Sequence, residues 1–127
     1  MADLDPYPSA ELAVCDALDD IVPASVWTGE DLPDRLPAAQ VRRIGGSDNG
    51  ITDIARLAVS VFAATAAQAR TLAEQVRQRL TSSPRRTPSG VLDRVSTESG
   101  PQIAPTADGA TVRRRDAVYR VRLRRRT

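Results

Sequence analysis

The sequence predicts an α+β fold in which a mostly antiparallel sheet of four to five strands carries two helices on one face. Three observations predict it. Several segments alternate apolar and polar residues with period two, turn-like residues separate most of them, and two further segments have the apolar spacing of helices. The expected element order is α-β-β-β-α-β-β. The 127 residues are expected to form one domain, residues 1–127, with flexible loops near 29–38, 81–90 and 100–110.

The first expected helix covers residues 9–22 and ends at Pro23. Its apolar face is expected to hold four side chains: Leu12, Cys15, Leu18 and Val22. A short strand is expected at residues 25–28. An acidic, proline-punctuated loop follows, because proline fits neither a helix interior nor a sheet ladder.

The next two strands, residues 39–44 and 51–64, are expected to form a hairpin whose turn is a polar, glycine-rich segment. That segment consists of Gly45, Gly46, Ser47, Asp48, Asn49 and Gly50. Asn-Gly supplies the positive φ angles of a tight turn. The glycine spacing matches no phosphate-binding loop, because a strand follows it and not a helix. Asp48 and Asp53 lack the ligand spacing of a calcium-binding loop.

The returning strand of this hairpin has one expected buried face. Its apolar positions are Ala55, Leu57, Val59 and Val61, which alternate with Arg56, Ala58, Ser60 and Phe62. A second amphipathic helix is expected over residues 65–80, where Thr65 and Gln68 match a capping box. Its buried stripe is expected to comprise Ala66, Ala69, Leu72, Ala73, Val76 and Leu80. Arg70 and Glu74 are expected to form a surface pair.

Two more strands are expected at residues 91–99 and 112–124. The last one should bury Ala117, Tyr119, Val121 and Leu123, which turns Arg120, Arg122 and Arg124 to the opposite face. Arginines are dense here, with eight between residues 113 and 126. Such a face either follows phosphates or pairs with carboxylates. The expected carboxylates are Asp31, Asp34 or the helix face from Asp16 to Asp20, either of the same subunit or of a neighbour, and a solvated edge is the alternative.

Composition argues against catalysis. The chain has no histidine, which removes the commonest general base and metal ligand, and all 18 basic residues are arginine. Cys15 is the only cysteine, so a disulfide within the chain is impossible, and we expect a buried structural thiol. We expect no enzyme, no cofactor and no metal. No apolar run is long enough to span a bilayer and the acidic start is not a signal peptide, so we expect a soluble chain made in the cytoplasm, with no membrane partner.

Four segments together resemble a known family. They are RIGGSDNGITD at residues 43–53, TAAQARTLAEQVRQRL at 65–80, STESGPQ at 96–102 and YRVRL at 119–123. Their order and spacing resemble the tail terminator (tail-completion) proteins of long non-contractile-tailed, siphovirus-type phages of actinobacteria, the lambda-like minor tail protein U type. The resemblance covers nearly the whole chain.

This resemblance implies a small α+β virion subunit of the tail-neck region that is assembled in the host cytoplasm. Such subunits form a homo-hexamer ring on the head-proximal end of the tail tube, end tube polymerisation and present a surface to the head-completion (stopper) protein. Genomic DNA would pass through the lumen without sequence-specific binding. The segment from Gly45 to Gly50 is the expected contact with the tube. Alternatives are another neck protein, a head-tail connector or stopper, or a small arginine-rich nucleic-acid-binding protein.

Overall fold

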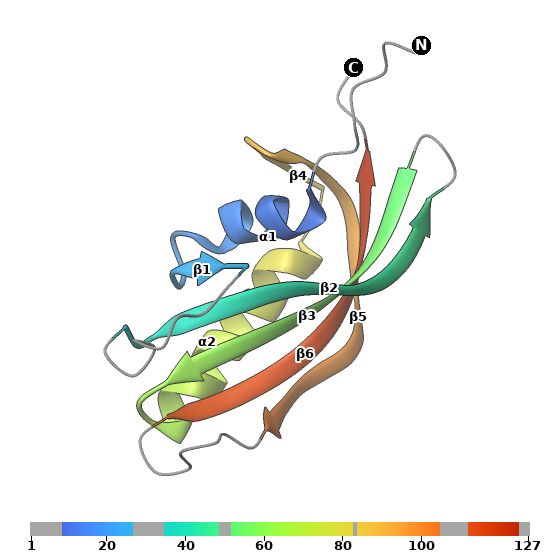
Figure 1. The fold of residues 1–127 in the computed structure, drawn as a ribbon. Helices are drawn as coiled ribbons and strands as arrows, with labels where there is room; N and C mark the ends of the chain where they lie inside the picture. Colours follow the sequence, from blue (N-terminus) through green and yellow to red (C-terminus); the bar gives the residue numbers. More distant parts are fainter. Residues whose placement is uncertain (1–8, 27–34, 49–51, 83, 105–111, 125–127) are drawn as a thin grey trace.

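A computed structural model describes residues 9–26, 35–48, 52–82, 84–104 and 112–124 of the chain (Figure 1). The elements are α1 (Ala10–Leu18), β1 (Ala24–Ser25), β2 (Ala38–Asp48), β3 (Thr52–Ala63), α2 (Ala66–Thr81), β4 (Arg85–Thr87), β5 (Gly90–Ala104) and β6 (Arg113–Arg124). The strands form one curled sheet in the order β1-β2-β3-β6-β5-β4. Neighbouring strands are antiparallel, except that β1 runs parallel to β2.

The predicted α+β class is confirmed, and both helices lie on one side of the sheet (Figure 1). The sheet has six strands where four to five were expected. The sixth is β4, which lies in a segment expected to be a loop. Its last residue, Thr87, exchanges two hydrogen bonds with Gly90: the hydroxyl donates to the carbonyl at 2.7 Å and accepts from the N–H at 3.1 Å. This tight connection folds β4 back onto β5.

The core lies between the two helices and the inner face of the sheet. Leu18 and Val14 of α1 and Leu80 of α2 are buried together with Leu57 of β3 and Val121 of β6. Both helices begin at hydroxyl N-caps, since Ser9 accepts from the N–H of Leu12 and Thr65 accepts from the N–H of Gln68. The N-cap half of the predicted capping box is thus present.

The helices differ from expectation in detail. Helix α1 ends at Leu18, and Leu12 is 49% exposed because the buried face is centred on Val14 and Leu18. In α2 the first stripe position, Ala66, is exposed, and the buried stripe begins at Ala69. The carboxylate of Glu74 binds Arg77, one turn further on, at 2.8 Å, whereas the sequence favoured Arg70.

Strand β5 is longer than expected and runs through Gly100 and Pro101, which the sequence placed in a loop. Pro101 fits because β4 pairs with β5 only at residues 90–92, so the outer edge of β5 has no described partner strand there. Of the strand expected at residues 25–28, Ser25 lies in β1, which ends there, and residues 27–28 lie outside the described residues. No helix among the described residues is long and apolar enough to cross a membrane.

Candidate functional site: the outer arginine face

Strands β3 and β6 pair along their whole length, and their alternation gives the sheet an inner and an outer face. We define the outer face as the side of the sheet away from both helices. The arginines that the strand register places on it are Arg42, Arg56, Arg86, Arg94, Arg114, Arg120, Arg122 and Arg124. The acids associated with them are Asp93, Glu98 and Asp116. Among the described residues the outer face therefore carries five more positive than negative charges.

The predicted alternation in β6 is confirmed. Tyr119, Val121 and Leu123 are at most 1% exposed, and the arginines between and after them are exposed on the opposite face. This placement follows from the pleat, since successive side chains of a strand point to opposite sides.

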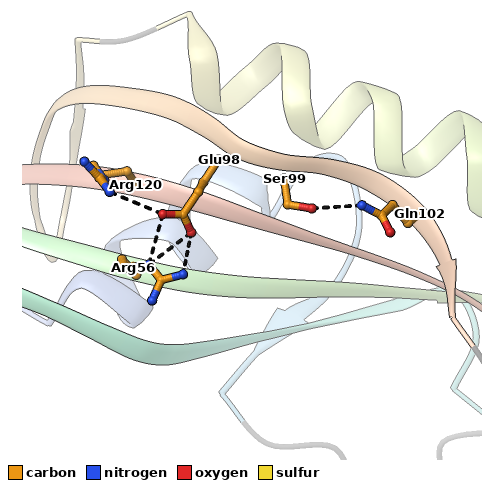
Figure 2. Close-up of polar contacts among 5 residues, drawn as sticks. All are labelled: Arg56, Glu98, Ser99, Gln102 and Arg120. Carbon is orange, nitrogen blue, oxygen red and sulfur yellow. Dashed lines mark hydrogen bonds and ion pairs between the residues drawn. The ribbon is translucent and has the colours of Figure 1, made fainter.

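Arg56 and Arg120 lie directly opposite each other on β3 and β6, and Glu98 of β5 separates their charges. Figure 2 shows the Glu98 carboxylate between the two guanidinium groups. Arg56 donates from Nη2 at 2.7 Å and from Nε at 3.0 and 3.1 Å, and Arg120 donates from Nη2 at 3.3 Å. Hydrogen bonds from Arg56 hold the pKa of Glu98 below its usual value and raise the pKa of Arg56.

A β-bulge places this carboxylate. The pairing of β5 with β6 shifts between Thr97 and Ser99, so Glu98 is the extra residue on its strand. Bulges redirect side chains near functional surfaces. Here the bulge allows Glu98 to reach across β6 to Arg56, two strands away (Figure 2).

Two other arginines of the outer face also have acidic partners. Arg124 contacts Asp93 at 3.2 Å, and Asp93 is again the extra residue of a bulge, between Leu92 and Arg94. Arg114 contacts Asp116 at 2.8 Å, and its guanidinium lies 5.5 Å from the centroid of the Phe62 ring. Each contact lies within the subunit.

Arg94 and Arg122 differ from these. They are directly opposite on β5 and β6, both are exposed, and no acid among the described residues forms an ion pair with either. Like charges directly opposite on neighbouring strands destabilise a sheet. The row across the sheet continues with Ile54 opposite Arg122 on β3 and Ser47 opposite Ile54 on β2, and neither carries a charge.

The glycine-rich segment is not a turn over its first four residues, which corrects the sequence-based prediction. Gly45, Gly46, Ser47 and Asp48 belong to β2 and pair with β3 up to Asp48 opposite Asp53. The bulge at Ile44 and the positive φ of Gly46, +129°, let the ladder continue beyond Arg43. Asn49 and Gly50 lie outside the described residues.

An ion pair joins the two strands at this end of the hairpin, and a hydrogen bond links the hairpin to α1. Arg43 contacts the buried carboxylate of Asp53 through both of its terminal nitrogens, at 2.7 and 2.9 Å. The N–H of Arg43 donates to Glu11 of α1 at 3.0 Å. Asp53, one of the two acids weighed for calcium, is therefore an arginine partner.

Reactive chemistry has no visible site among the described residues. Burial raises the pKa of the Cys15 thiol to about 11, so the nucleophilic thiolate is scarce at neutral pH. Burial also raises the pKa of Tyr119 to about 12, and its hydroxyl has no hydrogen-bond partner. In the part of the chain that the structure describes, no three His, Cys, Asp or Glu side chains are grouped to hold a metal. The chemistry that the exposed arginines of the outer face can perform is the binding of anions.

Sequence reasoning placed Arg120, Arg122 and Arg124 together on one face but missed Arg56 and Arg94. It also missed Glu98 and Asp93 as acidic partners on this face. The predicted acceptors for the arginines were Asp31, Asp34 and the face from Asp16 to Asp20. The first two lie outside the described residues. Within the subunit Arg120 and Arg124 pair instead with Glu98 and Asp93. The STESGPQ segment contains Glu98, but only the bulge reveals its partner.

Comparison with known proteins gives a fold match. No family model matches the chain, and no curated protein matches it by sequence. Among solved structures, a chain of the "Virion of native gene transfer agent (GTA) particle" is similar, with a TM-score of 0.55 and 18% sequence identity. The similarity covers 91% of this chain and 87% of that one. The two chains therefore share their fold over almost their full lengths.

Proposed function

We propose that this protein is a structural subunit of a phage-like virion, and more specifically a tail terminator of the siphovirus type. The observation that carries the proposal is the fold match to a gene transfer agent virion chain, which extends over 91% of this sequence. The four sequence segments that resemble tail terminators support the finer assignment. They lie in β2 and β3, in α2, in β5 and in β6, and thus in the elements that build this fold.

In this role six copies form a ring on the head-proximal end of the tail tube, stop its polymerisation and receive the stopper protein. The unreactive Cys15 and the absence of a grouped metal site among the described residues fit a protein that works by assembly. The outer edge of β5 beyond its contact with β4 offers backbone groups for contacts with a neighbour. The glycine-rich segment of Gly45 to Gly50 remains the proposed tube contact.

Deletion of the gene from its phage or phage-like element tests the assignment. We expect normal heads, together with tails of uncontrolled length or tails that fail to join heads, in negatively stained lysates. Loss of a head-tail connector or stopper would leave tail length normal, so the length of the tails distinguishes these proteins from a terminator. Normal infectious particles from the deletion would contradict every neck assignment.

The arginine face favours one other function, a small nucleic-acid-binding protein. The two functions differ in solution. A ring subunit gives a multimer by size-exclusion chromatography with light scattering, whereas a DNA binder stays monomeric and its affinity for duplex DNA falls steeply with salt.

A further inference from the structure

We infer that the Arg94–Arg122 pair is half of a subunit contact, and that the acidic helix α1 of a second copy completes it. The inference rests on the proposed ring and specifies which surfaces meet in it. It starts from an imbalance. Arg56 of β3 and Arg120 of β6, one row further along β6, are also directly opposed, and Glu98 bridges them. Arg94 and Arg122 are opposed with no acid in their row.

Two opposed guanidinium groups make a binding site for a carboxylate or a phosphate. Each guanidinium presents a planar set of N–H donors that matches two oxygens. An external anion relieves the repulsion between the two charges, so its binding energy exceeds that of a single surface ion pair. Both side chains are exposed and accessible to such a partner.

The surroundings favour a protein carboxylate over a nucleic-acid backbone. Asp93, Glu98 and Asp116 are interspersed among the arginines, so a phosphate chain laid along β6 would meet a carboxylate beside almost every arginine. The single aromatic residue among the described outer-face positions, Phe62, is only 6% exposed, which leaves no stacking platform for bases on this part of the face. A point contact from an acidic side chain avoids both difficulties.

This chain itself carries the complementary surface. Helix α1 and the two residues after it contain Glu11, Asp16, Asp19 and Asp20 and no basic residue. Asp20 is bound by Arg79 at 2.6 Å, and Asp16 accepts from the hydroxyl of Ser89 at 2.6 Å. Asp19 is exposed and forms no ion pair with any described residue, and Asp16 has a hydroxyl partner but no cationic one among them.

The geometry explains why one subunit cannot satisfy both surfaces. Helix α1 packs on the inner face of the sheet (Figure 1), whereas the strand register places Arg94 and Arg122 on the outer face. A contact between the outer face of one copy and α1 of the next is heterologous, because it joins two different surfaces. Each terminal copy of a growing assembly therefore still has one of the two surfaces unoccupied. Such contacts continue until a ring closes. The charge surplus of the outer face then meets the four acids of α1 and the residues that follow it.

A charge exchange between subunits tests the inference. Arg122→Glu and Asp19→Arg are made separately in the full chain, and each is measured by size-exclusion chromatography with light scattering. We expect each variant alone to lose the multimer that the wild-type chain forms, with at least about a tenfold weaker association. In Arg122→Glu the new carboxylate faces Arg94 within the subunit, so the thermal midpoint should not fall and misfolding is not the cause.

Mixing the two variants is the decisive step. In the mixture, each contact joins one copy of each variant. Contacts of the wild-type kind, between Arg122 and Asp19, then alternate around an even-numbered ring with contacts in which both charges are reversed. Every contact again joins opposite charges, so the multimer should return. Arg70→Glu, on the exposed side of α2, is the matched control and should assemble like the wild type.

The remaining outcomes overturn the inference. They are normal assembly of Arg122→Glu, no recovery on mixing, or an intact multimer whose duplex DNA binding alone is lost, which would assign the pair to nucleic acid. A wild-type chain that stays monomeric at all concentrations also overturns it. Because the deletion phenotype reports on tail length independently, the terminator assignment stands if only the charge exchange fails.

Discussion

The two faces of strands β3 and β6 are built from the same sequence alternation but obey different physical rules. On the inner face Leu57 and Tyr119 lie opposite each other and are fully buried, so packing decides the fold there. On the outer face the adjacent pair is Arg56 and Arg120, which repel each other and depend on Glu98. The inner face determines the fold of the subunit, whereas a binding partner can lower the electrostatic energy of the outer face.

The largest expected difference in stability is between two alanine variants, one on each face of the sheet. Leu57 has no exposed surface, so Leu57→Ala should lower the free energy of unfolding by about 2–5 kcal/mol through lost burial and a cavity. The variant Arg56→Ala, at the neighbouring outer-face position, should unfold at nearly the wild-type urea concentration because the Arg56–Glu98 ion pair is solvated. Equal losses in urea unfolding would show that the outer face also holds the subunit together.

The next largest effect concerns two adjacent glycines in β2, one facing each side. Gly46 has φ of +129°, and a Cβ there would lie 2.1 Å from the carbonyl oxygen of Ile54. Gly46→Ala should therefore cost about 1–3 kcal/mol of unfolding free energy.

Gly45 is the matched control for that change. A Cβ at Gly45 meets Arg56 at an ordinary 3.7 Å, and its φ is not positive. Gly45→Ala should be neutral or stabilise by up to about 1 kcal/mol, because alanine loses less backbone entropy on folding. If the two alanine variants unfold alike, the hairpin does not need the Gly46 conformation.

These glycines show where sequence reasoning ended. The alternation in β3 and β6 predicted their buried faces, because the period of a strand is a local property. The extent of β2 was not predictable in this way, because its bulge at Ile44 depends on the register with β3. The same holds for Glu98 and Asp93, whose carboxylates reach their arginines only because bulges in β5 redirect them. Strand β4 depends on the contact between Thr87 and Gly90, which apolar periodicity does not record.

A smaller effect of opposite sign is expected inside the core. The Tyr119 hydroxyl is buried without a partner, so Tyr119→Phe removes an unsatisfied polar group and should leave stability unchanged or raise it by up to about 1 kcal/mol.

The stability of Tyr119→Phe should also depend on pH differently from that of the wild type. Burial raises the pKa of Tyr119 from 10.0 to about 12, so the folded state holds the phenol proton more tightly than the unfolded state does. The stability that comes from this difference is fully present below pH 10 and is lost as pH rises through 12. Unfolding followed from pH 8 to 12 should show a shallower alkaline decline in Tyr119→Phe than in the wild type. Cys15, with its pKa of about 11, causes a decline of its own that the substitution leaves in place. A lower stability of Tyr119→Phe at neutral pH would reveal a partner for the hydroxyl.

The smallest expected effect is that of Glu98→Gln, and it is informative because of its pH dependence. Hydrogen bonds from Arg56 lower the pKa of Glu98 below 4.5, so the carboxylate stabilises the fold above that pH and the contribution disappears as pH falls through the lowered pKa. Glu98→Gln should be slightly less stable than the wild type at pH 7 and should converge with it in acid.

A second substitution, Arg120→Gln, removes the opposed charge and should restore part of the loss at pH 7, because Arg56 then faces no like charge. If Glu98→Gln stays below the wild type by the same margin at every pH, the carboxylate acts through packing and not through charge. The contrast between the Glu98-bridged row and the unbridged Arg94–Arg122 row would then lose its electrostatic basis.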